Sequence, residues 1–596
     1  MIRRLVAVSV LVVAATPAGA ATAAPPGAPM QCGAGARTLS QYTDHVYPDT
    51  GNGGYTSLHT DVHMVYDAAS NQFLPGNHVV LTDRATQCMT EFSLDLERQS
   101  VDPVDGPDLT VQAVTVNGEP AAFRFVQPTY PGDPNGPDDP DPRSHQASQV
   151  NPVGGPDNNP LPPACSPQVT GDDVNAQNGE PCPANKMVIT PAQYIHPSET
   201  FQVSISYTGR PGVHLDGDGS TEGWFRSDNP PGDGGFVTTE PVGTEDWMPL
   251  NDHPSAKPTY DFYDTVNAGK QAIANGMLVS TTANLPDATF PGGSTTFHWH
   301  SPAPIASYLV ENSVGDYDLT SRLASDGVRY YEAQASSLSA TQKQANLAIM
   351  DQQQDITDFQ AQFNGPFPFT SDGVLVARPS AGFEEEMQTM IAFEGGRIGL
   401  RTFNHENFHQ WWGDHVTEAN YNLTFFKEGM ATLGEYLFNA RNAQTAAGGA
   451  GTSAGDAAFE QRLVSQFNTN YASTRLWTAA PSDPTPATLF SGSFTYTRPG
   501  TAYLALREIL GPDNFVRALT RIQRDYGDSS ITEAQLEDGF AHFLPNRSAA
   551  CQARLGEFFT QWFDTAYLPG GGANRPQLTG PGLAGPGFYD ADGRCR

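Results

Sequence analysis

A His-Glu-x-x-His motif at residues 405–409 constrains the fold of this 596-residue chain more than any other feature of its sequence. On a helix, positions i and i+4 lie on one face, so His405 and His409 can bind one metal ion between them. Glu406 would lie beside the open position of that metal, where it can take a proton from water. The motif therefore predicts a helix that carries a hydrolytic metal centre.

A third metal ligand is expected from the segment that follows. Glu428 comes after residues 410–427, and two histidines with one carboxylate are typical of a catalytic zinc site. Apolar residues recur around Glu428 at steps of three and four, which predicts a second helix that presents this glutamate inward. These apolar residues are Leu423, Phe426, Met430, Leu433 and Leu437. The sequence thus predicts one Zn²⁺ per chain, bound by His405, His409 and Glu428.

The spacing of these ligands resembles that of the gluzincin metallopeptidases, and the flanking residues resemble the aminopeptidase N family. Residues 409–414, His-Gln-Trp-Trp-Gly-Asp, are similar to the family's extension of the first helix. Residues 427–429, Lys-Glu-Gly, are similar to its Asn-Glu-Gly, with lysine in place of asparagine. The resemblance extends from about Tyr55 to Leu568. It implies an aminopeptidase that hydrolyses the N-terminal peptide bond of peptides through a zinc-activated water.

The resemblance and the local patterns together predict a multidomain fold. Short alternating runs from Tyr55 onwards predict an N-terminal antiparallel β-sheet domain over residues 25–320. A Pro/Gly/Asp-rich insertion at 127–187 cannot bury a core, and its aspartates could bind Ca²⁺ although they lack EF-hand spacing. A thermolysin-like α/β catalytic domain with a helical C-terminal lobe is expected over 321–568, before a Gly/Pro-rich tail at 569–596. The large C-terminal helical domain of longer family members is not expected.

The N-terminus has the pattern of a secretory signal peptide. Arg3 and Arg4 precede an apolar run at 5–15 and then several small residues, so we expect a signal peptide over 1–24. The mature protein is then expected to be secreted and extracellular, with no membrane anchor. With 65 acidic against 32 basic residues, its net charge of −33 disfavours nucleic acid as a partner.

Six cysteines in an exported chain suggest three disulfide bonds. Cys165 with Cys182 and Cys551 with Cys595 are the expected pairs, because each pair brackets a loop-rich segment. Such bonds would stabilise the fold rather than take part in catalysis.

The resemblance also implies a site for the α-amine of a substrate. Glu240 matches the family's glutamate or glutamine, which reaches out of the β domain to this amine. Residues 383–387 lie where the family has its Gly-x-Met-Glu-Asn exopeptidase motif, and Glu386 takes the place of the motif's glutamate. Because neighbours on a strand alternate faces, Glu384 would point with Glu386 towards the substrate and Glu385 away. The expected partner is a peptide with a free N-terminus.

Tyr496 is the residue that the resemblance assigns to the oxyanion of the tetrahedral intermediate. The family has Tyr-x-Lys/Arg-Gly here, which Tyr496 and Arg498 match, while Pro499 replaces the glycine. Two other readings stay open. One is a gluzincin endopeptidase whose glutamate-rich segment binds no α-amine. The other is a zinc-binding protein that has lost peptidase activity, which the intact Glu406 and Tyr496 disfavour.

Overall fold

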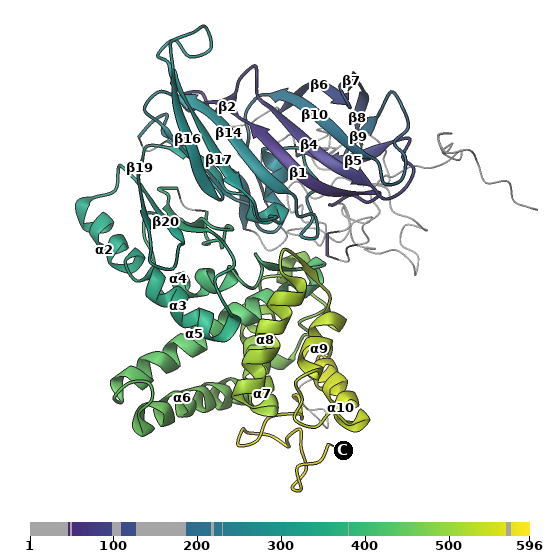
Figure 1. Cartoon of the computed structure of the whole chain (residues 1–596), viewed down its shortest axis with the longest axis vertical. Coiled ribbons are helices and arrows are strands. Elements are labelled where there is room, and N and C mark those ends of the chain that lie inside the picture. Colours follow the sequence, from purple (N-terminus) through teal and green to yellow (C-terminus); the bar gives the residue numbers. More distant parts are fainter. Residues whose placement is uncertain are drawn as a thin grey trace, which may run out of the picture.

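The computed structural model describes residues 44, 46–47, 50–97, 109–126, 186–215, 220–228, 230–379, 381–567 and 574–595. A β-sheet domain lies at one end of the molecule and a helical region at the other, with a smaller mixed sheet between them (Figure 1). This arrangement confirms the predicted fold class. The predicted signal peptide, residues 127–185 of the insertion and the expected Cys165–Cys182 pair lie outside the described residues.

A ten-stranded sheet forms most of the β domain, in the order β16-β17-β14-β1-β4-β10-β6-β7 with β2 and β3 attached. Most neighbouring strands are antiparallel, although β1 pairs with β14 in parallel. Alternate residues are buried along β4 and β14, as expected for a sheet with one face on the core. The strands are β1 (Tyr55–His63), β2 (Val65–Asp67), β3 (Gln72–Phe73), β4 (His78–Ala85), β6 (Thr110–Val116), β7 (Glu119–Pro120), β10 (Thr200–Thr208), β14 (Thr259–Asn267), β16 (Met277–Asn284) and β17 (Ser294–Ser301).

Two smaller sheets complete this domain. A five-stranded sheet has the order β11-β12-β13-β18-β15, and a three-stranded sheet has the order β5-β9-β8. Strand β13 is buried along its length, and the loop that follows it carries Glu240. The strands are β5 (Phe92–Asp95), β8 (Ala122–Val126), β9 (Lys186–Thr190), β11 (Val213–Leu215), β12 (Thr221–Ser227), β13 (Gly234–Thr238), β15 (Gln271–Ala274) and β18 (Asn312–Gly315).

The chain after the β domain begins with a mixed four-stranded sheet in the order β19-β20-β21-β22, in which β20, β21 and β22 are parallel. Helices α2 and α3 connect β20 to β21. These elements are β19 (Tyr317–Leu323), β20 (Arg329–Ala335), α2 (Ala340–Met350), α3 (Gln353–Asn364), β21 (Ser371–Val376) and β22 (Ile391–Phe393).

Helices make up most of the rest of the described chain, around a second hydrophobic core. The predicted Cys551–Cys595 disulfide is present and ties the C-terminal segment to α10. Within the described ranges, every helix is too short or too polar to cross a membrane. The elements are α4 (Leu400–His409), β23 (Val416–Glu418), α5 (Thr424–Ala446), α6 (Ser453–Ala472), α7 (Arg498–Leu510), α8 (Pro512–Tyr526), β24 (Ser529–Ile531), α9 (Glu533–Ala541) and α10 (Ala549–Phe559).

Helices α5 and α7 approach each other closely at two glycines. A Cβ atom on Gly429 would lie 2.4 Å from Cβ of Pro499, and one on Gly500 would lie 2.7 Å from Cγ2 of Thr432. Only glycine fits at such a contact. The contact places the π-helical turn η7 (Gly492–Thr497), which leads into α7, against the start of α5.

Candidate active site

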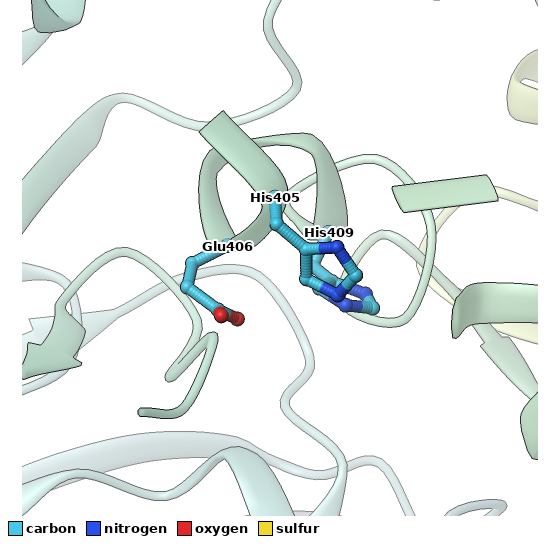
Figure 2. A group of neighbouring side chains, drawn as sticks. All are labelled: His405, Glu406 and His409. Atoms are coloured by element: carbon cyan, nitrogen blue, oxygen red, sulfur yellow. The ribbon is translucent and has the colours of Figure 1, made fainter. Parts of the chain in front are cut away.

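Helix α4 is held from its outer side by α3. The side chain of Asn407 donates to Oε1 of Gln360 at 2.7 Å, and both residues are buried. A buried polar contact of this kind fixes the rotation of a helix about its axis. The inner side of α4 presents the motif residues His405, Glu406 and His409 (Figure 2).

The predicted metal ligands converge on one point. Nε2 of His405 lies 3.2 Å and Nε2 of His409 lies 3.4 Å from the same oxygen, Oε2 of Glu428. The other ring nitrogens are occupied: Nδ1 of His405 lies 3.0 Å from the Glu435 carboxylate, and Nδ1 of His409 lies 2.8 Å from the carbonyl oxygen of Trp412. When each Nδ1 donates its hydrogen there, each Nε2 presents a lone pair to Glu428.

The separations of both histidines from Glu428 match those between ligands around a zinc ion. Three acceptor atoms that face one another repel unless a cation lies among them. Two ligands about 2.0–2.1 Å from a tetrahedral zinc ion lie about 3.3–3.4 Å apart, close to the separations from Glu428. Burial disfavours a charge on His405, but Glu428 and Glu435 outweigh it and raise its pKa well above the ordinary value. The site thus favours positive charge.

Glu406 lies next to the two histidines, and its carboxylate oxygen and one nitrogen of each ring lie within 4.8 Å of one another. Figure 2 shows its carboxylate extending to one side of the two imidazole rings, whose centroids are 4.8 Å apart. Burial is the main cause that raises the pKa of Glu406 to about 8, and the neighbouring histidines act in the opposite direction. A carboxylate with a raised pKa is suited to hold and release a proton during catalysis.

Tyr496 also lies at this site, because the π-helical turn η7 brings it there. Its ring centroid is 5.9 Å from that of His405. Pro499 occupies the first turn of α7, where a proline needs no hydrogen-bond partner, so the replacement of the family's glycine is accommodated.

Arg498 anchors this turn rather than contacting the site. Its guanidinium is fully buried, and burial lowers its pKa to about 10. It donates to backbone carbonyl oxygens of the surrounding loops, namely those of Ala479, Gln561, Trp562 and Thr565 at 2.5–3.0 Å. The arginine that matches the family motif therefore has a structural role here.

Replacing Arg498 by methionine should lower the free energy of unfolding by about 3–5 kcal/mol, because several buried carbonyl groups lose their donors. Urea denaturation of the purified protein measures this loss. The control is Arg517→Met, which removes an exposed arginine from α8 and should change stability by less than about 0.5 kcal/mol. Equal stability of the two variants would contradict the anchoring role.

The two glutamates expected to bind the α-amine lie together, and a lysine lies between them. Nζ of Lys427 donates to Oε1 of Glu240 and, at 2.5 Å, to Oε1 of Glu386. It also lies 3.4 Å from Oε1 of Glu428 and 4.3 Å from the centroid of the Tyr308 ring. Burial opposes the charge on Lys427, but Glu240 and Glu386 outweigh it and raise its pKa well above the ordinary value.

Glu385 has a structural contact that the sequence did not indicate. Its backbone forms an isolated bridge with Ala392, and its buried carboxylate accepts a hydrogen bond of 2.7 Å from the backbone nitrogen of Thr239. Thr239 immediately precedes Glu240. Glu385 therefore holds the loop that presents Glu240.

Glu384 is not brought to the lysine with Glu386. It is half-buried, and the charged groups that act on it most strongly are Glu394 and Arg397. The expectation that Glu384 and Glu386 point the same way required a regular strand. Outside the bridge at Glu385, this segment has no strand pairing, so the alternation of faces does not apply.

Sequence reasoning missed two residues that contribute to the site, Glu435 and Lys427. Glu435 follows Glu428 by two helical turns, so the spacing could have indicated that both face His405. The position of Lys427 had no comparable signal, because its partners come from two distant segments.

Comparisons with known proteins agree with this geometry. Residues 398–562 match the model of the Peptidase family M1 domain. Human aminopeptidase RNPEPL1 is 23% identical over 346 residues, which cover 56% of this chain and 45% of that protein. The chain thus spans about half the length of this curated relative.

Solved structures share the fold over nearly their whole length. The crystal structure of an M1 zinc metallopeptidase from Deinococcus radiodurans superposes with a TM-score of 0.64 and 20% identity, covering 88% of this chain and 98% of that one. A variant of that protein bound to a Tyr-Ser-Ala substrate gives the same values. Residues 398–562 are thus similar to the Peptidase family M1 domain, and the chain shares the fold of an M1 zinc metallopeptidase.

Proposed function

We propose that this chain is a secreted zinc-dependent aminopeptidase that hydrolyses the N-terminal peptide bond of peptides. The observation that carries the proposal is the convergence of His405, His409 and Glu428, with Glu406 and Tyr496 beside it. Secretion rests on the signal-peptide pattern of the N-terminus. The relative that binds a Tyr-Ser-Ala substrate supports peptides as the substrate class.

Each of these residues has a separate chemical role in the proposed reaction. Zinc held by the three ligands would polarise the scissile carbonyl group and make water a better nucleophile at neutral pH. The Glu406 carboxylate takes the proton of the attacking water and passes it to the leaving amine. The Tyr496 hydroxyl donates a hydrogen bond to the carbonyl oxygen as negative charge develops there.

Glu240 and Glu386 would set the position of cleavage. They come from different domains, yet both contact the same ammonium group of Lys427. An ammonium bound there would hold the substrate by its N-terminus and fix the distance to the scissile bond.

The direct test is hydrolysis of a panel of aminoacyl-anilides by the purified protein, with and without a chelator. Chelation should abolish activity, and added zinc should restore it. Faster cleavage inside N-acetylated peptides than of any free-amine substrate would favour the endopeptidase alternative. Zinc binding without hydrolysis of any peptide would favour the protein that has lost its activity.

The ligand assignment makes a separate prediction about metal content. Wild-type protein should bind one zinc ion at this site, and Glu428→Ala should lose affinity for it by well over tenfold. Glu435→Gln should weaken binding by about 10- to 100-fold, because His405 loses the carboxylate that orients it. Metal titration monitored by calorimetry measures both. Unchanged affinity in Glu428→Ala would refute the assignment of the third ligand.

A further inference from the structure

The ammonium group of Lys427 is surrounded by acidic and aromatic side chains. It donates hydrogen bonds to Glu240 and Glu386, and it lies 3.4 Å from a Glu428 oxygen and over the Tyr308 ring. The side chain is 0% exposed, so no water takes part in its solvation from outside. The lysine is thus a fixed component of the site.

The charged group of Lys427 is chemically the same as the N-terminus of a peptide substrate. The α-amine of a peptide at neutral pH is also an –NH₃⁺ group, and the proposed function assigns it to Glu240 and Glu386. Each of these carboxylates already accepts a hydrogen bond from Lys427. A second ammonium cannot approach the same oxygens without displacing the first, because like charges repel strongly where water is excluded.

The backbone of Lys427 cannot move away from the two glutamates, because of its position on α5. It immediately precedes Glu428 on α5, so the backbone of the lysine is fixed by the helix that supplies a metal ligand. Only its side-chain torsions can change. In the family resemblance this position is asparagine, which is shorter and uncharged and would leave the two carboxylates without this partner.

We propose that Lys427 is an internal occupant of the site for the substrate's α-ammonium, and that it makes this peptidase accept peptides without a charged N-terminus nearly as well as those with one. The inference rests on the proposed function, since it concerns the same site. Peptides with an acylated or otherwise uncharged N-terminal nitrogen are the substrate class that this arrangement favours.

The test compares an aminoacyl-anilide with its N-acetylated counterpart, using zinc-loaded wild type and Lys427→Met. Methionine is similar in length to lysine but has no charge. In the wild type, kcat/KM for the two substrates should agree within about tenfold. Lys427→Met should raise the ratio of kcat/KM for the free-amine substrate to kcat/KM for the acetylated substrate by about 10- to 150-fold, the range of a charge-assisted hydrogen bond.

The control is Lys257→Met. Lys257 donates to the carbonyl oxygen of Asp414 at 2.6 Å and to the hydroxyl of Thr417 at 2.7 Å, but not to the two glutamates. Its replacement removes a lysine without freeing Glu240 or Glu386, so the ratio of the two kcat/KM values should stay at the wild-type value.

Lys427→Met leaves two buried carboxylates without a cation and can therefore fail to fold. A charge-balanced variant tests the proposal in that case. Glu240→Gln with Lys427→Met removes one charge of each sign and leaves Glu386 to bind the α-ammonium. Its preference for the free-amine substrate should also exceed that of the wild type.

Binding of leucinamide, measured by calorimetry, gives a readout independent of turnover and should tighten in both Lys427 variants. If folded Lys427 variants show neither tighter binding nor a changed substrate ratio, Lys427 is only a structural counter-ion and the inference is overturned. Weaker binding of leucinamide would overturn it as well. If no variant hydrolyses any substrate but leucinamide binding tightens, the proposed function and the substrate preference fail, while Lys427 stands as the occupant of the ammonium site.

Discussion

Replacing Glu406 by glutamine should lower kcat by about 10²- to 10⁴-fold while zinc remains bound. Glutamine keeps the shape of the side chain but cannot accept a proton from water. The substitution also leaves His405, His409 and Glu428, the proposed metal ligands, in place. Steady-state kinetics and metal content, measured on the same preparation, test both parts.

Glu428→Ala is the comparison for this variant, since it should lose metal affinity as well as activity. The two variants therefore separate loss of the proton acceptor from loss of the ion. Near-normal turnover in Glu406→Gln would show that another group accepts the proton.

Replacing Tyr496 by phenylalanine should lower kcat by about 10²- to 10³-fold with little change in KM. The substitution removes one hydroxyl donor and almost no volume, so the ring contact with His405 at 5.9 Å is kept. The loss is confined to the transition state because the carbonyl oxygen needs the donor most when it becomes negative.

Tyr503→Phe is a matched control on the adjacent helix α7. The hydroxyl of Tyr503 is buried and has no hydrogen-bond partner within the described part of the chain. Its removal should leave kcat at the wild-type value. A raised KM with unchanged kcat in Tyr496→Phe would assign Tyr496 to substrate binding instead.

The convergence of His405, His409 and Glu428 could be predicted from the sequence because the geometry of each helix is local. The i, i+4 spacing of His405 and His409 fixes their common face once the segment is helical, and apolar periodicity indicates which way Glu428 points. Both conditions hold in α4 and α5, where the inward-facing residues are buried.

The substrate side of the site was harder to predict for a physical reason. The direction of Glu384 depended on strand pairing that is present only at Glu385. The partners of Lys427 depend on how the two domains meet, since Glu240 comes from the β domain. Local patterns of residues do not contain such information.

The glycine contact between α5 and α7 limits how far Glu428 and Tyr496 can move relative to each other. Glu428 and Tyr496 belong to different helical segments, but Gly429 and Gly500 let Pro499 and Thr432 of the facing helices lie directly against their backbones. The spacing between Glu428 and Tyr496 therefore depends on a close contact that leaves no room for a larger side chain. Repacking elsewhere in the helical region can alter stability while the reacting groups keep their relative positions.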